Sequence, residues 1–374
     1  MTFNRKRLTF AVAMKIFLHV PDNGRSMYER WEKGIFPGHF LYGATHFGEY
    51  GIEMVMRVHK EYPNRLMRML DGARQILFCK EHYEAVFATY HNGIAIVVMM
   101  RALGLFRKKI VVWHHQPVIK SPKWWREWLG KIYYRGMDSI IFFSEKLRDE
   151  SVRTGKIKAS QAHVCHWGAD MAFYDRVMAT VCPKSGERVV RSDGEGMSSM
   201  RFISTGKELR DMPTLVSAFN RTGQELDIYI SKHTGGEDYE ALFSTLHMES
   251  NVHVHFTEEG KQSELSYRVA EASCVVICCK ETNYTVGLTT VVEALALGKP
   301  IICSRNPNIP VDFDKEGCGI SVDYYDVEGW VKAVDYIAAH PTEALEMGKK
   351  AYNLARTLYN DEVCGSEVAG ILVR

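Results

Sequence analysis

The chain has 374 residues, of which 46% are hydrophobic and 25% are charged, and its formal net charge is +2. This length suits two domains of ordinary size, and the nearly balanced charge gives no general attraction to nucleic acid. The nine cysteines are scattered without metal-site spacing, so we interpret them as small buried residues of a protein in a reducing compartment.

The N-terminal residues resemble the start of a secretory signal, because three basic residues, Arg5 to Arg7, precede a short apolar run. Lys15 interrupts that run, and no small-residue cleavage site follows. We therefore predict a basic extension over residues 1–13, a first strand over 14–20 and a cytoplasmic protein. Turn residues at 21–24 follow this strand, at the end where open α/β sheets bind ligands.

Strands and helices are expected to alternate through the first half of the chain, as in a parallel doubly wound sheet. The segment Phe36–Gly43 is expected to lead into a helix that ends near Glu53, and a further helix is expected over about 93–103. We predict strands at residues 76–79, 85–89 and 109–113. His114 and His115 follow the last of these strands, where side chains point into a crevice, and either is a candidate site residue.

A helix rich in tryptophan is predicted from Ser121 to Arg135, with Ser121 as its cap. Trp124, Trp125 and Trp128 lie on it among lysines and arginines. Such a helix could lie in a membrane interface and meet a lipid-linked acceptor. Packing of the same helix on its own sheet is an equally good explanation.

A polar stretch rich in glycine and serine at residues 182–200 lacks a periodic apolar face, and we interpret it as a linker or a mobile loop. A strand predicted directly after it leads into Gly206, Lys207 and Arg210. Two cations at the exit of a strand suit a diphosphate, which lysine binds as a point charge and arginine as a fork.

The most informative stretch is residues 275–304, which predicts a strand over 275–279, a helix over 289–297 and a strand over 301–303. The connecting loop places Gly287, Leu288 and Thr289 at the start of the helix. Free backbone N–H groups and the helix dipole make such a start an anion site, and Thr289 and Thr290 add hydroxyl donors. Glu293, one turn further, would repel a phosphate but suits a sugar hydroxyl, so the combination indicates a nucleotide sugar.

The sequence Gly-Leu-Thr-Thr-Val-Val-Glu-Ala-Leu-Ala-Leu-Gly-Lys-Pro-Ile-Ile, from Gly287 onward, resembles the donor-binding signature of retaining glycosyltransferases of family 4, which have the GT-B fold. The resemblance implies two Rossmann-like domains with parallel sheets that face each other across a cleft. We expect an acceptor-side domain over 1–180, a linker over 181–199 and a donor domain over 200–354. Residues from about 355 to 374 would cross back to the first domain.

The resemblance also implies roles for the candidate residues. Lys207 and Arg210, next to Gly206, would neutralise the donor diphosphate, and Glu293 would hold the ribose. His114 or His115 would lie near the reacting sugar, and the segment with Gly38 would approach the donor phosphates. The family has a glutamate that touches the donor sugar eight positions before Glu293, where this chain has Thr285.

These implications predict retaining transfer of a hexose from a nucleoside diphosphate sugar to a hydroxyl of a saccharide or lipid-linked acceptor, in polysaccharide or glycoconjugate synthesis. No Asp-x-Asp motif stands beside the phosphate elements, so we expect no metal and no cofactor apart from the donor substrate. Thr285 keeps a catalytically silent nucleotide-sugar-binding subunit open as an alternative, and a GT-B epimerase is another. A Rossmann dehydrogenase is disfavoured, because no Gly-x-Gly-x-x-Gly follows an early strand.

Overall fold

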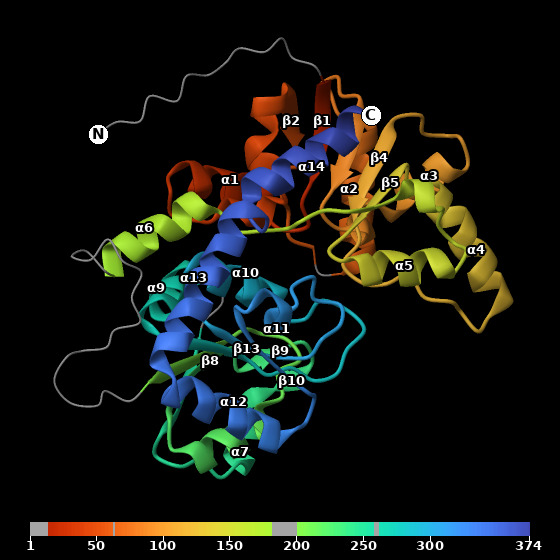
Figure 1. Cartoon of the computed structure of the whole chain (residues 1–374). Coiled ribbons are helices and arrows are strands. Elements are labelled where there is room, and N and C mark those ends of the chain that lie inside the picture. The colour runs from red at the N-terminus through yellow and green to blue at the C-terminus, as the bar shows by residue number, and fades with distance from the viewer. Residues whose placement is uncertain (1–13, 63, 182–199, 258–261) are drawn as a thin grey trace. The chain divides into compact units, whose positions relative to one another are not determined.

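The computed structural model describes residues 14–62, 64–181, 200–257 and 262–374 (Figure 1). The chain divides into two compact units, the first formed by residues up to Trp167 together with Asp361–Arg374, and the second by Gly168–Asn360. Within the described ranges, no helix combines the length and the apolar composition that crossing a membrane requires. The extension predicted over residues 1–13 lies outside the described residues.

The first unit is built on six parallel strands in the order β2-β1-β3-β4-β5-β6. Its central strands are almost completely buried and rich in valine, isoleucine and phenylalanine, as strands covered on both faces require. The strands are β1 Met14–His19, β2 Ile52–Met56, β3 Ala85–Ala88, β4 Lys109–Trp113, β5 Ser139–Phe142 and β6 Ala162–Val164.

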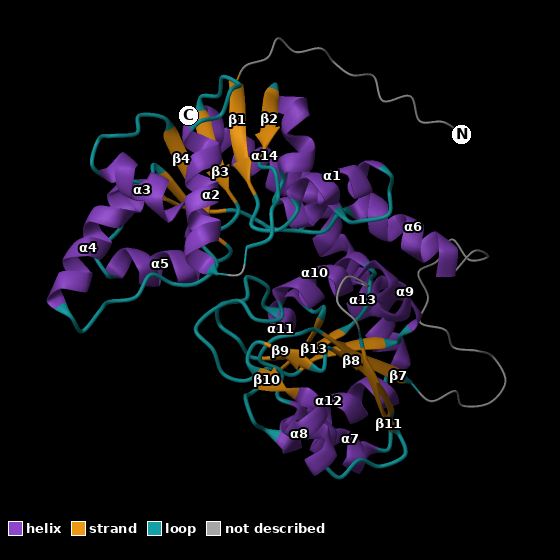
Figure 2. Ribbon diagram, turned by 180° about the vertical axis from the view of Figure 1, so that it is seen from behind, coloured by secondary structure: helices purple, strands orange, loops and turns teal. Residues whose placement is uncertain are grey.

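Helices connect these strands and cover the sheet (Figure 2). The α-helices are α1 Gly24–Glu32, α2 Arg65–Leu77, α3 Ala95–Ala102, α4 Trp124–Arg135, α5 Glu145–Arg153 and α14 Asp361–Val373. Four short 3-10 helices complete the unit: η1 Gly38–Leu41, η2 Ala44–Tyr50, η3 His91–Ile94 and η4 Ala159–Gln161.

Two predictions for this unit were wrong, one at helix α2 and one at the edge strand β2. The predicted strand at residues 76–79 is the end of α2, which starts after Asn64, whose side chain accepts the N–H of Met67 at 2.9 Å. The second strand is instead β2, in a segment where we expected a helix to end. Only Ile52 of β2 is buried, so the strand lacks the apolar run of a central strand.

The segment predicted as a single helix before Glu53 contains η1 and η2, which meet at Tyr42 and Gly43, both with left-handed backbone conformations. Helix α4 begins at Trp124 rather than at Ser121. The backbone N–H of Ser121 donates to the Glu127 carboxylate at 2.8 Å, and the Ser121 hydroxyl accepts only the N–H of Lys123, at 3.3 Å. Ser121 therefore shapes the loop before the helix rather than its first turn.

The second unit contains a separate sheet of six parallel strands in the order β11-β8-β7-β12-β13-β14. The strands predicted at residues 275–279 and 301–303 are confirmed, and the helix between them, α10, starts one residue earlier than expected. The strands are β7 Arg201–Thr205, β8 Glu225–Ile230, β11 Val252–Phe256, β12 Cys274–Ile277, β13 Ile301–Ser304 and β14 Gly319–Val322, with a small hairpin of β9 His233–Thr234 and β10 Glu237–Asp238.

Figure 2 shows α7, α8 and α12 on one face of this sheet and α9, α10 and α13 on the other. The core beneath α7 and α12 includes the fully buried Phe219 and Trp330. The helices of the unit are α6 Met171–Val181, α7 Met212–Thr222, α8 Tyr239–Thr245, α9 Gln262–Glu271, α10 Leu288–Ala296, α11 Phe313–Glu316, α12 Val327–Ala339 and α13 Pro341–Thr357.

The division of the chain differs from the predicted boundaries. Helix α6 belongs to the second unit, where it packs against α9 and α10, so the first unit ends at Trp167 rather than near residue 180. Residues 182–199 of the predicted linker lie outside the described part of the chain. The return to the first unit is made by α14, whose last carbonyl groups, of Ile371 and Leu372, accept from Lys109 Nζ at 2.7 and 3.1 Å.

Candidate functional site

The order of strands in the second unit locates a candidate ligand site. The chain leaves β7 towards β8 on one side, while β12 lies on the other side of β7. Open α/β sheets bind ligands beyond the carboxyl ends of the strands at such a switch point. The predicted residues Gly206–Arg210 follow β7, and Gly287–Glu293 follow β12, so the fold brings both predicted segments to this end of the sheet.

Arg210 lies at the centre of this switch point and is 3% exposed. Its Nε and Nη2 donate to the carbonyl oxygen of Thr205 at 3.3 and 3.1 Å, and Nη2 also donates to the Thr290 hydroxyl at 3.3 Å. Its Nη1 donates to the carbonyl oxygen of Glu208 at 3.2 Å and to Cys279 Sγ at 3.3 Å. All five N–H groups thus meet protein acceptors, and Arg210 ties the end of β7 to β12 and α10 while supplying positive charge.

Gly206 is required for this arrangement. Its φ of 132° lies in a region that L-residues rarely adopt, and a Cβ atom there would overlap the Arg210 guanidinium. Lys207 is exposed, and its side chain makes no hydrogen bond or ion pair within the residues that the structure describes. Of the two predicted cations, Lys207 is therefore the one whose side chain is available to a ligand without rearrangement.

The start of α10 has the features that an anion site requires. Gly287 precedes the helix with a φ of 92°, and no side chain caps the first turn. A Cβ atom on Gly287 would lie 2.8 Å from Ile277 Cγ2, so glycine is needed both for the turn and for close packing on β12. Leu288 and Thr290 are buried, while Thr289 is partly exposed. The N–H groups of a first helical turn have no intrahelical acceptor, and the positive end of the helix dipole is added to them.

Glu293 lies on the same helix and accepts a hydrogen bond from the Ser266 hydroxyl of α9 at 2.5 Å. Burial raises the pKa of Glu293 to about 7, although the hydrogen bond from Ser266 acts in the opposite direction. Burial likewise raises the pKa of Tyr174 on α6, and the charge of Glu293 adds to this effect. Burial therefore disfavours the charged form of this carboxyl group, so its ionisation costs stability. Such a cost is typical of a functional residue.

The two histidines after β4 make different hydrogen bonds. His114 is buried, with Nδ1 2.5 Å from the carbonyl oxygen of Gln116 and Nε2 3.1 Å from the hydroxyl of Tyr134. Since a carbonyl can only accept, Nδ1 carries the proton and Nε2 accepts from Tyr134. Burial lowers the pKa of His114 to about 4. Both nitrogens of His114 are therefore occupied by the protein itself.

His115 is only partly buried, and its Nε2 lies 2.8 Å from the carbonyl oxygen of Thr89. That contact makes Nε2 the donor and leaves Nδ1 with an unshared electron pair. Burial lowers the pKa of His115 as well, although the hydrogen bond with Thr89 acts in the opposite direction. Only His115 of this pair has a nitrogen left to contact a substrate hydroxyl.

The sequence reasoning missed His91, which lies on η3 after β3. Its ring stacks on that of His114 with centroids 4.5 Å apart and planes 4° from parallel. Burial, followed by the positive charges of His114 and His115 when protonated, lowers the pKa of His91 to about 3. The signal was available, because His91 stands at the exit of a predicted strand just as His114 does.

Two further predicted positions have simpler surroundings. A Cβ atom on Gly38 would lie 2.8 Å from Trp31 Cδ1 and 2.9 Å from Thr45 Cγ2, so packing alone explains that glycine. Thr285 is partly buried and its carbonyl oxygen accepts the N–H of Leu288 at 3.2 Å. Among the described residues, no group of three or more His, Cys, Asp or Glu side chains is arranged to hold a metal ion.

A family model described as glycosyl transferases group 1 matches residues 215–354. The chain contains a glycosyl transferases group 1 domain. This domain spans α7 to α13 and includes the start of α10 and Glu293, whereas Gly206–Arg210 lie before it. The family resemblance recognised in the sequence is thereby confirmed. No curated protein sequence matches the chain.

Solved structures with the same fold include the Anabaena protein HepE in complex with UDP-glucose and a sucrose-phosphate synthase from Thermosynechococcus elongatus. HepE is 12% identical, with a TM-score of 0.65 over 96% of this chain and 99% of HepE. The synthase is 15% identical, with a TM-score of 0.68 over 96% of this chain and 98% of its own. A glycosyltransferase from Rickettsia africae is 14% identical, with a TM-score of 0.64 over 96% and 97% of the two chains. These similarities confirm the predicted GT-B fold.

Proposed function

We propose that the protein transfers a hexose from a nucleoside diphosphate sugar to an acceptor hydroxyl, with retention of configuration and without a metal ion. The observation that carries this proposal lies at the switch point of the second unit, where an uncapped helix start, two cations and a half-neutral carboxyl group follow neighbouring strands. UDP-glucose is our first candidate donor, because HepE has been crystallised with it.

In this proposal, the leaving diphosphate lies at the start of α10. The N–H groups of Thr289 and Thr290, the helix dipole and the Lys207 ammonium group stabilise the negative charge that develops there as the glycosidic bond breaks. Arg210 acts over a longer distance, because its donors already bind the protein, and it keeps the ends of β7 and β12 in register. Glu293 accepts hydrogen bonds from the ribose hydroxyl groups.

The first test is a thermal shift assay against uridine, guanosine and adenosine diphosphates and their sugars. A ligand at about 100 times its dissociation constant adds roughly 2.7 kcal/mol to the stability of the state that binds it. We expect UDP and UDP-glucose to raise the melting temperature of the wild type, and Lys207→Ala and Glu293→Gln to weaken this response. Lys332→Ala, which removes an exposed lysine from α12, is the matched control. No response from the folded wild type to any nucleotide would refute the donor site.

For the reaction centre we propose His115, whose Nδ1 would accept a hydrogen bond from the donor sugar or from the acceptor. His115→Ala should lower turnover of UDP-glucose at least tenfold while leaving the affinity for UDP within about twofold, because general acid–base and positioning contacts act on the reacting groups. His114→Asn removes the ring but keeps a polar side chain, and should affect stability more than turnover. The opposite pattern would assign the reaction centre to His114.

For the acceptor we propose a saccharide or lipid-linked hydroxyl, presented at the inner face of a membrane that α4 contacts. Trp124, Trp125 and Trp128 are 80%, 44% and 59% exposed, and no residue of α4 is buried. Lysine and arginine residues flank them, as on helices that lie in the interface of an anionic bilayer. This placement would make the protein a peripheral cytoplasmic enzyme of polysaccharide or glycoconjugate synthesis.

Liposome flotation tests the membrane contact. The wild type should float with vesicles that contain anionic lipid, and Trp124→Ser with Trp128→Ser should abolish this binding. Leu66→Ser on α2, which removes a 58% exposed apolar side chain elsewhere on the first unit, is the control. Equal flotation of all three proteins would argue against α4 as the contact.

Thr285 favours one alternative, a catalytically silent subunit that binds the nucleotide sugar for an active partner. This subunit would respond to UDP-glucose in the thermal shift assay but would neither hydrolyse nor transfer the sugar. Restoring the carboxylate with Thr285→Glu should then create activity, whereas an active wild type excludes this alternative.

A further inference from the structure

The first unit has its own switch point, between β1 and β3. The chain leaves β1 for β2 on one side and returns to β3 on the other. Beyond the carboxyl end of β1 lies the loop 21–24, which we call the β1–α1 loop and which runs into the first turn of α1. Asn23 caps this helix by accepting the N–H of Ser26 at 3.1 Å. Ligands of open α/β sheets contact loops in this position.

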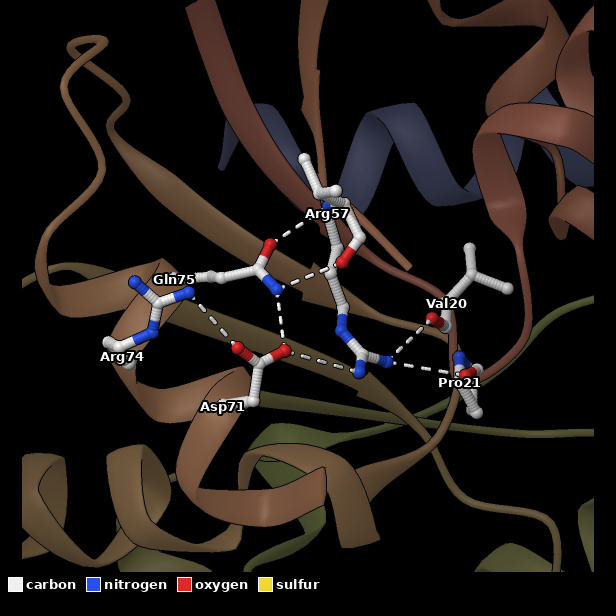
Figure 3. Close-up of polar contacts among 7 residues, drawn as sticks. Val20, Pro21, Arg57, Asp71, Arg74 and Gln75 are labelled. Carbon is white, nitrogen blue, oxygen red and sulfur yellow. Dashed lines mark hydrogen bonds and ion pairs between the residues drawn. The ribbon is translucent and has the colours of Figure 1, made fainter. Parts of the chain in front are cut away.

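Arg57 continues the hydrogen bonding of β1 after the sheet has ended. Its backbone N–H donates to the carbonyl oxygen of Leu18 at 3.2 Å, as a neighbouring strand would. Its Nη1 then donates to the carbonyl oxygens of Val20 and Pro21 at 3.4 and 3.2 Å, as Figure 3 shows. A single residue thus satisfies three carbonyl groups of β1 and its exit, the last of which belongs to the β1–α1 loop.

Helix α2 holds the Arg57 guanidinium in place (Figure 3). Arg57 Nη2 lies 3.7 Å from the buried Asp71 carboxylate, which also accepts from Gln75 Nε2 at 2.6 Å and from Arg74 Nη2 at 3.2 Å. The Gln75 amide additionally exchanges two hydrogen bonds with the backbone of Val58, at 2.8 and 2.9 Å. Arg57 and Asp71 are each 6% exposed, so the guanidinium is fixed in one geometry and screened from solvent.

The same helix contacts the other side of the switch point. A Cβ atom on Gly72 would lie 2.5 Å from the carbonyl oxygen of Gly93, and Arg65 Nη2 donates to the Asn92 side chain at 2.9 Å. The ring of His19 is fully buried against Gly93, and neither of its nitrogens has a hydrogen-bond partner within the described residues. The side chain of His19 therefore gives the β1 exit no polar anchor, and that of Arg57 supplies one.

We propose that Arg57 is a positioning residue that fixes the β1–α1 loop for substrate binding by the first unit. The inference rests on the proposed glycosyl transfer and adds to it a residue remote from the donor elements. The fork of a guanidinium can bind two carbonyl oxygens and a carboxylate at once, whereas the ammonium group of lysine cannot do so in the same plane. A displacement of about 1 Å in a group that orients the substrate costs on the order of 100-fold in rate.

The test compares Arg57→Lys with Arg74→Gln. Arg74 binds the same carboxylate but does not touch the loop, and its side chain is 61% exposed, so it is the matched control. Amide hydrogen exchange of residues 20–27 should be at least tenfold faster in Arg57→Lys than in the wild type. Turnover of UDP-glucose, measured as release of UDP, should fall at least tenfold. The affinity for UDP should stay within twofold, because Lys207, Thr289 and Thr290, which we propose to stabilise the diphosphate, belong to the second unit. Arg74→Gln should match the wild type in all three measurements.

Gln75→Leu provides a second test of the same inference. It removes the hydrogen bonds of Gln75 to Asp71 and to the backbone of Val58, while the Arg57 side chain itself is unchanged. It should show the same changes at smaller size, and it decides the question if Arg57→Lys does not fold. Unchanged exchange in both variants overturns the inference, as does faster exchange without loss of turnover. A wild type that neither binds nor turns over UDP-glucose instead overturns the proposed function, and the two failures are thereby distinguished.

Discussion

Replacing Glu293 with glutamine should stabilise the second unit above neutral pH while weakening its binding of a nucleotide sugar. Burial raises the pKa of this carboxyl group from 4.5 to about 7. The difference, at about 1.4 kcal/mol for each pH unit, corresponds to at most about 3 kcal/mol, because the side chain is only partly buried. The folded state holds the proton more tightly than the unfolded state. The contribution of Glu293 to stability is therefore complete below about pH 4.5 and is lost as the pH rises to about 7.

Glutamine has no proton to lose and can still accept the hydrogen bond of Ser266. Urea unfolding followed by circular dichroism, at about pH 5 and about pH 8, should give nearly equal stabilities at the lower pH. At the higher pH, Glu293→Gln should be more stable by about 2–3 kcal/mol. Glu271→Gln, which changes an exposed carboxylate of α9, should show no such difference. If Glu293→Gln is less stable than the wild type at the higher pH, the carboxylate is charged and stabilising there, and our reasoning fails.

Two further substitutions test contacts that stabilise the two units, one in each unit. Burial lowers the pKa of His46, but the neighbouring carboxylates of Asp361 and Glu49 outweigh burial and raise the pKa to about 9. The ion pair therefore stabilises the first unit fully below about pH 6.5, and this stabilisation is lost as the pH rises through about 9. His46→Gln should remove this dependence, as measured by tryptophan fluorescence, since six of the seven tryptophans belong to the first unit; an unchanged pH profile would contradict it. Gly206→Ala should displace Arg210 and destabilise the second unit by about 3 kcal/mol or more in urea, with loss of the thermal response to UDP-glucose. A stable variant with normal nucleotide binding would show that Arg210 can move freely.

The sequence predicted the second unit well where its signal is local. Residues 275–304 combine two short apolar strands with a helix whose start and stop are marked by Gly287 and Gly298, and each of these signals acts within a few residues. The first unit was harder to predict, because β2 is an edge strand in which buried and exposed residues do not alternate. The predicted strand at residues 76–79 contains the apolar pair Ile76 and Leu77, which belongs to the end of α2. The start of this helix is marked by its cap Asn64, and our prediction did not use that signal.

The site was predictable as a set of segments but not as a set of contacts. The order of the parallel strands brings Gly206–Arg210 and Gly287–Glu293 to the same end of the sheet. The alternation of strands and helices predicts a parallel sheet, and both segments follow strands at the end where such sheets bind ligands. The N–H groups of Arg210 find acceptors only because the carbonyl groups of Thr205 and Glu208 point towards the guanidinium. The chain turns there at Leu209, which has a left-handed backbone conformation with a φ of 50°. No spacing in the sequence reveals such a turn at a residue other than glycine.

Helix α14 makes the first unit discontinuous in sequence, and this affects the order in which the protein can fold. The 193 residues from 168 to 360 separate it from the strands it covers. At about 5–20 residues per second, a ribosome needs roughly 10–40 s to synthesise them. During that time, Lys109 and His46 lack the partners that α14 provides. The second unit, which is continuous, can complete its core first, so the half of the molecule that is made first is completed last.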